Sequence, residues 1–146
     1  MAEQTMAQDV PSLIRMIDEL RPTLQATSAQ GEQDRRVAQE SIDALEKIGA
    51  FRVTQPQKYG GFQGTSQNHV DVASAVGRGD GGAAWVTALH NMAGWLTALL
   101  PEQAQDDVWA EDPNTKVTVV LATNGKTKRA PGGYAVSGAW GYASGS

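Results

Sequence analysis

The chain contains no cysteine, and this absence excludes both a disulfide framework and a thiolate metal site. It has only two histidines, His69 and His90, and they do not stand at the H-x-x-x-H spacing of helical metal ligands. Basic residues are also few, since 12 Lys and Arg oppose 16 Asp and Glu. With a formal net charge of -4 and no basic tract, we expect no bound metal, no nucleic-acid partner and no membrane partner.

A secretory signal is missing as well, because the opening residues MAEQTMAQDV lack a basic region followed by an apolar one. We therefore expect a cytoplasmic protein. The stretch from Gly82 to Leu100 carries no charge and meets the crude length criterion for a membrane span. Polar residues such as His90 and Asn91 dilute its apolarity and no basic cluster flanks it, so the sequence favours a helix buried in a water-soluble domain.

Two rows of mainly apolar residues follow this stretch at helical spacing. The first row is Trp85, Leu89, Met92, Leu96 and Leu99, and the second is Val86, His90, Ala93, Thr97 and Leu100. A helix that is apolar over more than half its circumference must be buried. We expect the Trp85 row to face the other helices and the His90 row to face a β-domain and a cavity. His90 is then a polar group in the core that needs a hydrogen-bond partner.

Other amphipathic segments surround this central helix. They are bounded by helix caps, by proline and by glycine pairs, which predict where each helix begins and ends. The expected elements are a helix from Ser12 that Pro22 kinks or splits, a polar connector at 27–33, a helix from about Asp34 to Ala50, a structured loop at 51–62, a helix from Thr65 or Ser66 through Val76, and a short helix at 102–110.

After residue 113 the helical periodicity ends. Val117–Ala122 is rich in β-forming residues, Asn124-Gly125 is a turn signal, and Tyr134–Ser137 and Ala139–Ala143 are typical of short strands. The sequence thus predicts an α+β chain, with an N-terminal all-α domain at 1–113 and the first strands of an antiparallel β-domain at 114–146. A sheet this small does not stand alone, so we expect a fragment of a larger protein.

Two glycine-containing segments allow both a functional and a structural interpretation. Gly77, Gly79 and Gly82 satisfy the G-x-G-x-x-G pattern of dinucleotide sites, but helices are predicted on both sides and Asp80 places negative charge where a phosphate would sit. A turn between two helices is therefore favoured. The segment W-G-Y-A-S-G at 140–145 can be an edge strand plugged by its Trp or a strand opened for a ligand, and composition alone favours the edge strand.

Three segments form a set in order and spacing. They are Gln55-Pro-Gln-Lys-Tyr-Gly-Gly61, the segment 79–90 that opens the charge-free helix, and the segment 132–145, which follows the pattern G-G-Y-x-x-S-G-x-W-x-F-x-S-G with Tyr142 in place of Phe. Together they resemble the acyl-CoA dehydrogenase fold and, within it, the oxygenase components of two-component flavin-dependent monooxygenases. The resemblance implies a helical domain, a middle β-domain and a C-terminal four-helix bundle that builds a homotetramer, with the bundle absent from this chain.

The resemblance also implies an activity. Such an oxygenase takes reduced FMN or FAD from a separate flavin reductase and uses O2 to hydroxylate a small aromatic or phenolic substrate through a flavin C4a-hydroperoxide. We expect this fragment alone to be inactive, because the missing bundle supplies part of the flavin contact surface.

The residues that match the family motifs carry the implied roles. His90 is expected to be catalytic, binding the substrate hydroxyl and accepting its proton, with Trp85 and Asn124 as further substrate contacts. Ser144 is expected to be catalytic through a hydrogen bond to flavin N5. The implied flavin contacts are Trp140, Tyr142, Ser144 and Gly145.

Two other functions stay open at this stage. An acyl-CoA dehydrogenase shares the fold, but its strand motif is W-I-T-N rather than the W-G-Y-A-S-G found here, which favours the oxygenase. A non-catalytic helical interaction module is the alternative from another class. Without the resemblance, a single His on an apolar helix is more often a hydrogen-bonded core residue than a catalyst.

Overall fold

The predicted order of helices followed by strands is present, and the chain is α+β. The computed structural model describes residues 6–145. Its helices are α1 (Val10–Asp34), α2 (Gln39–Ile48), α3 (Ser66–Gly77), α4 (Gly81–Ala98) and α5 (Glu102–Trp109), and a short 3-10 turn occupies Gln57–Tyr59. The strands β1 (Lys126–Ala130) and β2 (Gly133–Ser137) pair antiparallel. No helix in this described part of the chain is long and apolar enough to cross a membrane.

Helix α1 begins earlier than predicted, after Asp9 rather than at Ser12. The Asp9 carboxylate accepts a hydrogen bond from the Ser12 backbone N–H at 2.7 Å, and the Ser12 hydroxyl accepts one from the Asp9 N–H at 3.1 Å. Ser12 is therefore the third helical residue of a reciprocal capping box.

Pro22 does not split α1, and the predicted connector at 27–33 is wrong. The helix runs without interruption past Pro22 to Asp34. Ile17 and Leu24, on either side of the proline, are both fully buried in the same core. Burial of this continuous apolar face outweighs the hydrogen bond that proline removes.

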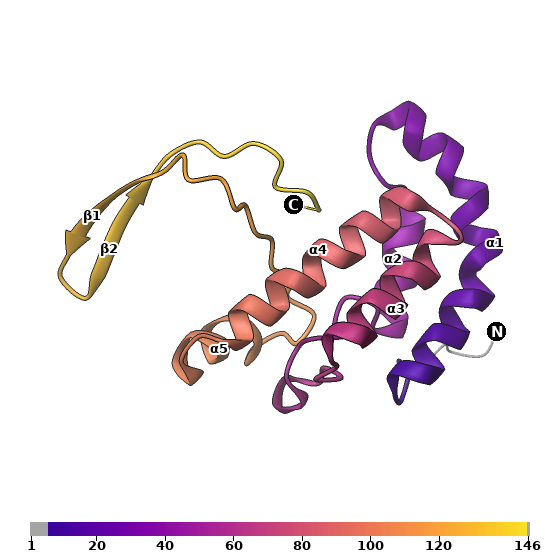
Figure 1. Ribbon diagram of the computed structural model, residues 1–146, viewed down its shortest axis with the longest axis horizontal. Coiled ribbons are helices and arrows are strands. Elements are labelled where there is room, and N and C mark those ends of the chain that lie inside the picture. The colour runs from indigo at the N-terminus through magenta and orange to yellow at the C-terminus, as the bar shows by residue number, and fades with distance from the viewer. Residues whose placement is uncertain (1–5, 146) are drawn as a thin grey trace.

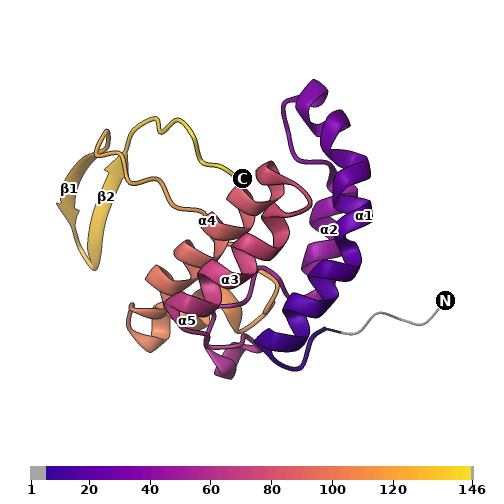
Figure 2. The same cartoon turned by 45° about the vertical axis from the view of Figure 1, so that its right-hand side comes forward.

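The helices pack around one common core and are together called the helical layer. Helix α3 packs along both α1 and α4, and α2 packs against α1 (Figure 1, Figure 2). The core between them is aliphatic, with Leu13, Ile17, Leu45, Ile48 and Val72 fully buried. Helix α5 contacts the end of α4 and closes the side of the helical layer.

Helix α4 is the predicted central helix, but its orientation differs from the prediction. The Trp85 row is not buried against the other helices: Trp85 and Leu99 are 61% and 64% exposed, and the residues between them are half-buried. The buried face of α4 carries small residues, among them Ala83, Ala93 and Gly94. Small side chains let neighbouring backbones approach closely, which the large residues of the Trp85 row do not allow. Within the second row, His90 is buried as expected and lies against the chain that follows α5.

The glycine-rich segment 77–82 is a turn between two helices, as favoured from the sequence. Asp80 is the N-cap of α4, and its carboxylate accepts a hydrogen bond from the Ala83 N–H at 2.9 Å. This carboxylate occupies the position at which a phosphate would bind. Arg78 pairs with Asp18 of α1 at 2.8 Å rather than with its neighbour Asp80.

The strands differ from the prediction. Val117–Ala122 and Ala139–Ala143 are not paired strands, whereas the unpredicted segment Lys126–Ala130 pairs with Gly133–Ser137. The charged sequence KTKRA has no apolar alternation, and its pairing follows from the tight turn at Pro131-Gly132, where Gly132 has φ +78°. Tyr142 interrupts the last predicted strand with φ +60°. The hairpin projects away from the helical layer (Figure 1).

Candidate functional site

An open groove of about 890 Å³ runs beside the N-terminal half of α4. Four of the predicted site residues line it, namely Trp85, His90, Ser144 and Gly145. The opposite side is formed by the C-terminal end of α1 and the corner that leads into α2, including Arg35, Arg36 and Val37. The groove therefore joins the charge-free helix to the end of the W-G-Y-A-S-G segment, which are about 60 residues apart in sequence.

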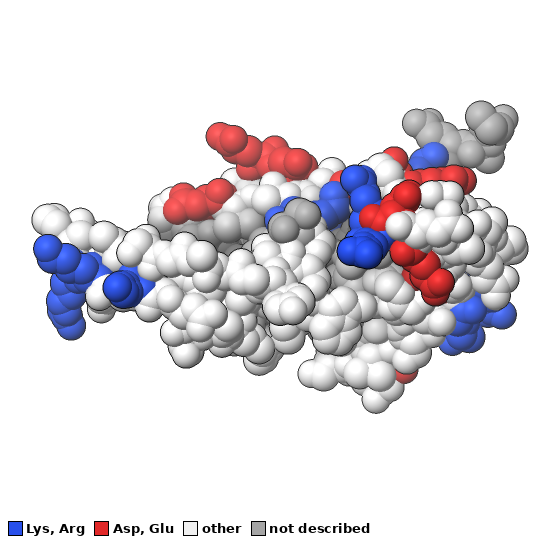
Figure 3. Space-filling view, turned by 90° about the horizontal axis from the view of Figure 1, so that it is seen from above, with Lys and Arg blue, Asp and Glu red and all other residues white. Residues whose placement is uncertain are grey.

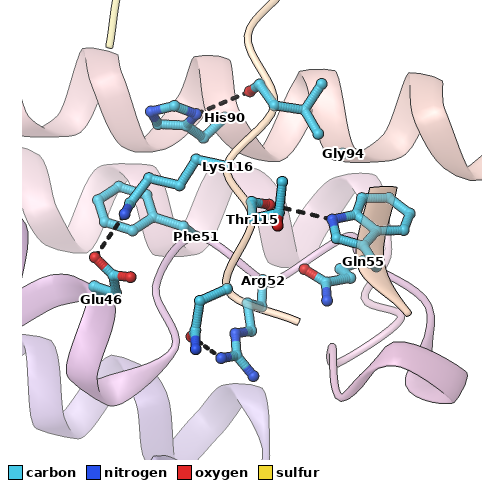
Figure 4. Close-up of a pocket in the computed structure, with 11 residues that line it drawn as sticks. Glu46, Phe51, Arg52, Gln55, His90, Gly94, Thr115 and Lys116 are labelled. Atoms are coloured by element: carbon cyan, nitrogen blue, oxygen red, sulfur yellow. Dashed lines mark hydrogen bonds and ion pairs between the residues drawn. The ribbon is translucent and has the colours of Figure 1, made fainter. Parts of the chain in front are cut away.

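His90 is held at the base of this groove with one ring nitrogen committed. Its Nδ1 lies 2.9 Å from the backbone carbonyl oxygen of Val117 (Figure 4). A carbonyl oxygen only accepts hydrogen bonds, so Nδ1 must carry the proton. In the neutral ring, Nε2 then has a free lone pair. The edge of the Phe51 ring packs against the imidazole at a centroid distance of 5.3 Å, which fixes its plane.

Gly145 passes directly over the free nitrogen of His90. A Cβ atom at Gly145 would lie 2.5 Å from His90 Nε2, so no side chain fits there. The residue also has φ +86°, a conformation that glycine adopts without strain. Ser144 precedes it along the groove. The local sequence Ser-Gly thus places a hydroxyl-bearing residue and an exposed backbone beside the imidazole.

A second, much smaller cavity lies on the other side of His90. Its volume is about 20 Å³, enough for one water molecule. It is bounded by the loop after α2 and by the chain that follows α5, including Arg52, Gln55 and Lys116 (Figure 4). Lys116 pairs with Glu46 of α2 at 2.6 Å, which fastens the chain after α5 to the helical layer.

The loop after α2 explains the P-x-x-Y-G-G pattern noted in the sequence. Gly60 ends the 3-10 turn with φ +77°, and a Cβ atom at Gly61 would lie 2.2 Å from the carbonyl oxygen of Gln55. Both glycines are therefore required by the backbone rather than by a ligand. The tyrosine of the pattern, Tyr59, donates a hydrogen bond to the Asp106 carboxylate of α5 at 2.5 Å.

This contact between Tyr59 and Asp106 perturbs the titration of the groups around it. Hydrogen bonds from Tyr59 and then from Lys58 stabilise the ionised carboxylate and lower the pKa of Asp106. Burial is the main cause that raises the pKa of Tyr59, and the hydrogen bond to Asp106 adds to it. Lys58 also pairs with Glu102, and the pKa of Lys58 is raised. These contacts anchor α5 to the turn and lie outside the groove.

The remaining predicted site residues do not line the groove. The Trp140 ring packs over the glycines at the base of the hairpin, where a Cβ atom at Gly125 would lie 2.5 Å from it. Tyr142 is 98% exposed, and Asn124 is exposed on the segment before β1. Their roles as flavin or substrate contacts stay predictions.

Sequence reasoning missed the groups that hold His90. The Val117 contact is made by a backbone carbonyl, which has no sequence signature. Phe51 and Asn91 had no predicted role, because neither belongs to a spacing motif. The structure also shows no cluster of three or more His, Cys, Asp or Glu side chains able to hold a metal within residues 6–145.

The chain resembles known proteins over most of its length. The family model described as "Acyl-CoA dehydrogenase, N-terminal domain" matches residues 4–112. The oxygenase subunit HsaA of a flavin-dependent monooxygenase from Rhodococcus jostii is 33% identical over 132 residues, which are 90% of this chain and 35% of that protein. The oxygenase component of an FADH2-dependent resorcinol hydroxylase from Rhizobium is 35% identical over 120 residues, 82% of this chain and 29% of that protein.

Comparison of the fold with solved structures gives the same result as the sequence comparison. The crystal structure of the HsaA monooxygenase from M. tuberculosis superposes with a TM-score of 0.87 at 32% identity, covering 91% of this chain and 36% of that one. The chain thus spans about a third of the length of the relatives it matches.

Proposed function

Because the chain belongs to the acyl-CoA dehydrogenase N-terminal domain family, we propose that it serves in the oxygenase component of a two-component flavin-dependent monooxygenase. The reaction is the hydroxylation of a small aromatic or phenolic substrate with O2 and externally supplied reduced flavin. The two relatives compared by sequence support this choice, since each is the oxygenase part of a flavin-dependent enzyme. The observation that carries it is His90, a buried imidazole that lines the groove, with Nδ1 bonded to the Val117 carbonyl and the unprotonated Nε2 next to Gly145.

His90 acts as the base toward the substrate hydroxyl. Nδ1–H is occupied by the Val117 carbonyl, so Nε2 is the nitrogen that accepts the phenolic proton. Removal of this proton increases the electron density of the aromatic ring, which makes ring carbon more reactive toward an electrophilic oxygen. In the resulting imidazolium, Nδ1–H remains bonded to the same carbonyl, so the ring keeps its orientation. Trp85 lines the groove next to the proposed phenol position.

Ser144 and Gly145 suit the edge of a flavin ring. Bound reduced flavin supplies the two electrons that activate O2 and the oxygen transfer itself. The Ser144 hydroxyl would hydrogen-bond flavin N5, and Gly145, which carries no side chain, would lie beside the ring. Trp140 and Tyr142 are proposed as further flavin contacts, and Asn124 as a further substrate contact. The FADH2 dependence of the resorcinol hydroxylase favours FAD over FMN.

The proposal extends to the organisation of the complete protein. We assign residues 1–113 to the helical domain and 114–146 to the opening of the β-domain. The partners are a flavin reductase and a small aromatic substrate, and the complete enzyme is a homotetramer in the cytoplasm.

The alternative within this family, an acyl-CoA dehydrogenase, is separated by one assay. With the complete protein and resorcinol or a similar phenol, supplied FADH2 should support oxygen uptake and hydroxylated product. Acyl-CoA under anaerobic conditions should leave added FAD oxidised. Reduction of FAD by acyl-CoA, without phenol hydroxylation, would instead assign the dehydrogenase reaction.

A substitution at Ser144 tests its proposed hydrogen bond to flavin N5. Ser144→Ala in the complete protein should raise the hydrogen peroxide released and lower the hydroxylated product per FADH2 consumed, roughly tenfold or more. Ser137→Ala, in the exposed strand β2, is the matched control and should leave this yield unchanged. An unchanged yield in Ser144→Ala would remove Ser144 from the flavin site.

A further inference from the structure

The carbonyl that orients His90 belongs to a segment without regular structure. Val117 lies in the extended chain between α5 and β1, and no strand pairs with it among residues 6–145. A carbonyl in an irregular segment does not hold a fixed position by itself. Other contacts must therefore keep it 2.9 Å from Nδ1 of His90.

The loop at residues 50–55, here called the clamp loop, grips the start of this segment. Gln55 is 4% exposed, and its Nε2 donates to the carbonyl oxygens of Pro113 at 3.0 Å and Tyr59 at 2.7 Å. Arg52 donates to the side-chain oxygen of the next residue, Asn114. Both contacts join chain positions about 60 residues apart.

The clamp loop is itself fastened to α4, on the side of the helix next to His90. The buried Asn91 side chain accepts from the Val53 N–H at 2.8 Å and donates to the Ala50 carbonyl at 2.8 Å. The Thr54 hydroxyl donates to the Asn91 backbone carbonyl. His90 and its neighbour Asn91 are thus connected by a series of contacts. Asn91 binds the clamp loop, the clamp loop binds the segment after α5, and that segment binds the His90 imidazole.

We propose that Gln55 is a positioning residue for His90. By holding the Pro113 end of the segment, it keeps the Val117 carbonyl on Nδ1 and leaves Nε2 unprotonated toward the groove. Two other contacts hold the same segment. The Lys116–Glu46 ion pair has side chains that are about one third exposed, and such pairs contribute little. The buried Trp109 indole N–H donates to the Thr115 carbonyl at 3.2 Å and acts together with Gln55. Gln55 is buried, so bulk solvent has little access to its two acceptor carbonyls when the side chain is removed.

The test is the tautomer of His90, read from imidazole ¹⁵N chemical shifts in the uniformly labelled 146-residue chain. The sequence has only two histidines, so His69 provides an internal reference signal that His69→Gln assigns. The wild-type chain should show His90 with Nδ1 protonated and Nε2 unprotonated. In Gln55→Met, which keeps the length of the side chain but removes its donors, the ratio of the Nδ1–H to the Nε2–H form should fall roughly fivefold, the bias given by one ordinary hydrogen bond.

Gln105→Met is the matched control. Gln105 also donates from Nε2 to two backbone carbonyls, those of Ala98 and Leu100, but it lies on α5 away from His90. A purely structural role for Gln55 predicts that both variants leave the His90 tautomer unchanged. An unchanged ratio in folded Gln55→Met overturns the proposal.

If Gln55→Met does not fold, the Asn114→Ala variant tests the proposal instead. This variant removes an exposed side chain and breaks only the Arg52 grip on the same segment. It should shift the ratio in the same direction, and no shift overturns the proposal. The inference rests on the proposed role of His90 only for its catalytic consequence, because the tautomer can be measured without flavin, O2 or substrate. A lost tautomer preference with normal hydroxylation would contradict the function and leave the positioning intact.

Discussion

At the scale of single residues, the groove depends on two positions that admit no substitute, His90 and the glycine above it. Gly145 meets two separate demands, a positive φ and the absence of a Cβ next to Nε2. The sequence motif could predict that Ser144-Gly145 approaches a ligand. It could not predict that the same glycine also lies against His90, because the two positions are brought together only by the return of the chain to α4.

Gly145→Ala should therefore displace the end of the chain from His90. Its Cβ would overlap the imidazole at 2.5 Å, so the ¹⁵N and ¹³C shifts of the His90 ring should change. Gly132→Ala is the matched control, since Gly132 has a similar φ of +78° but no atom within 4 Å of its added Cβ. Equal His90 spectra in the two variants would show that Gly145 does not contact the imidazole.

Asn91 is the residue whose loss should destabilise the fold most clearly. Asn91→Ala leaves the Val53 N–H and the Ala50 carbonyl buried without partners, so the free energy of unfolding should fall by about 3 kcal/mol. Asn68→Ala removes an exposed capping contact of α3 and should cost about 1 kcal/mol. Urea unfolding followed by Trp fluorescence compares the two, and similar losses would contradict the central place of Asn91.

At the scale of elements, the local sequence pattern predicted which segments are helices, but it did not predict which side of a helix is buried. Apolar spacing identified α4, yet large residues such as Trp85 and Leu99 are exposed and the buried face carries mainly small ones. Helix α1 continues past Pro22 because its apolar face is buried on both sides of the proline, although proline is disfavoured inside a helix. The hairpin strand Lys126–Ala130 was missed because it is exposed on both faces and has no alternation.

Helix α5 depends on an ionised carboxylate, which makes its anchorage sensitive to acid. The hydrogen bonds from Tyr59 and Lys58 lower the folded-state pKa of Asp106 below its unfolded value. This contribution is fully present above the ordinary Asp pKa of about 3.9 and is lost as pH falls through the lower folded value. Asp106→Asn should therefore flatten the acid side of the stability curve between about pH 5 and about pH 2.

The measurement is urea unfolding across that pH range, with Asp107→Asn as the control. Asp107 is the exposed neighbour on α5 and has no contact with Tyr59 or Lys58. Wild type and Asp107→Asn should lose stability in parallel as the pH falls. A wild-type curve that matches Asp106→Asn would mean that this carboxylate does not anchor α5.

At the scale of the whole molecule, charge divides where the helices end. Residues 1–112 carry eight basic and 16 acidic residues, whereas residues 113–146 carry four basic and no acidic residues. The basic side chains of the hairpin gather at its projecting end (Figure 3). Within the described residues, the Lys116–Glu46 pair is the ion pair that joins the two parts, next to the groove. The sequence could predict this division, because it is a property of composition alone.

The site was less predictable than the fold. Family motifs supplied His90, Ser144 and Gly145, which the structure brings to one groove. The carbonyl of Val117 and the clamp loop could not be predicted, because backbone contacts between distant segments leave no residue pattern. Which groups orient the imidazole is therefore knowable only from the folded chain.

The central claim is that His90 accepts the proton of the substrate hydroxyl, and His90→Ala in the complete protein tests it most directly. The measurement is hydroxylated phenol formed per FADH2 consumed, together with kcat, for a phenol that the wild-type protein hydroxylates. Removal of a general base should lower kcat about 100-fold or more, while His69→Ala, a change in the half-buried His of α3, should retain the wild-type rate. Wild-type rate and yield in folded His90→Ala would contradict the account.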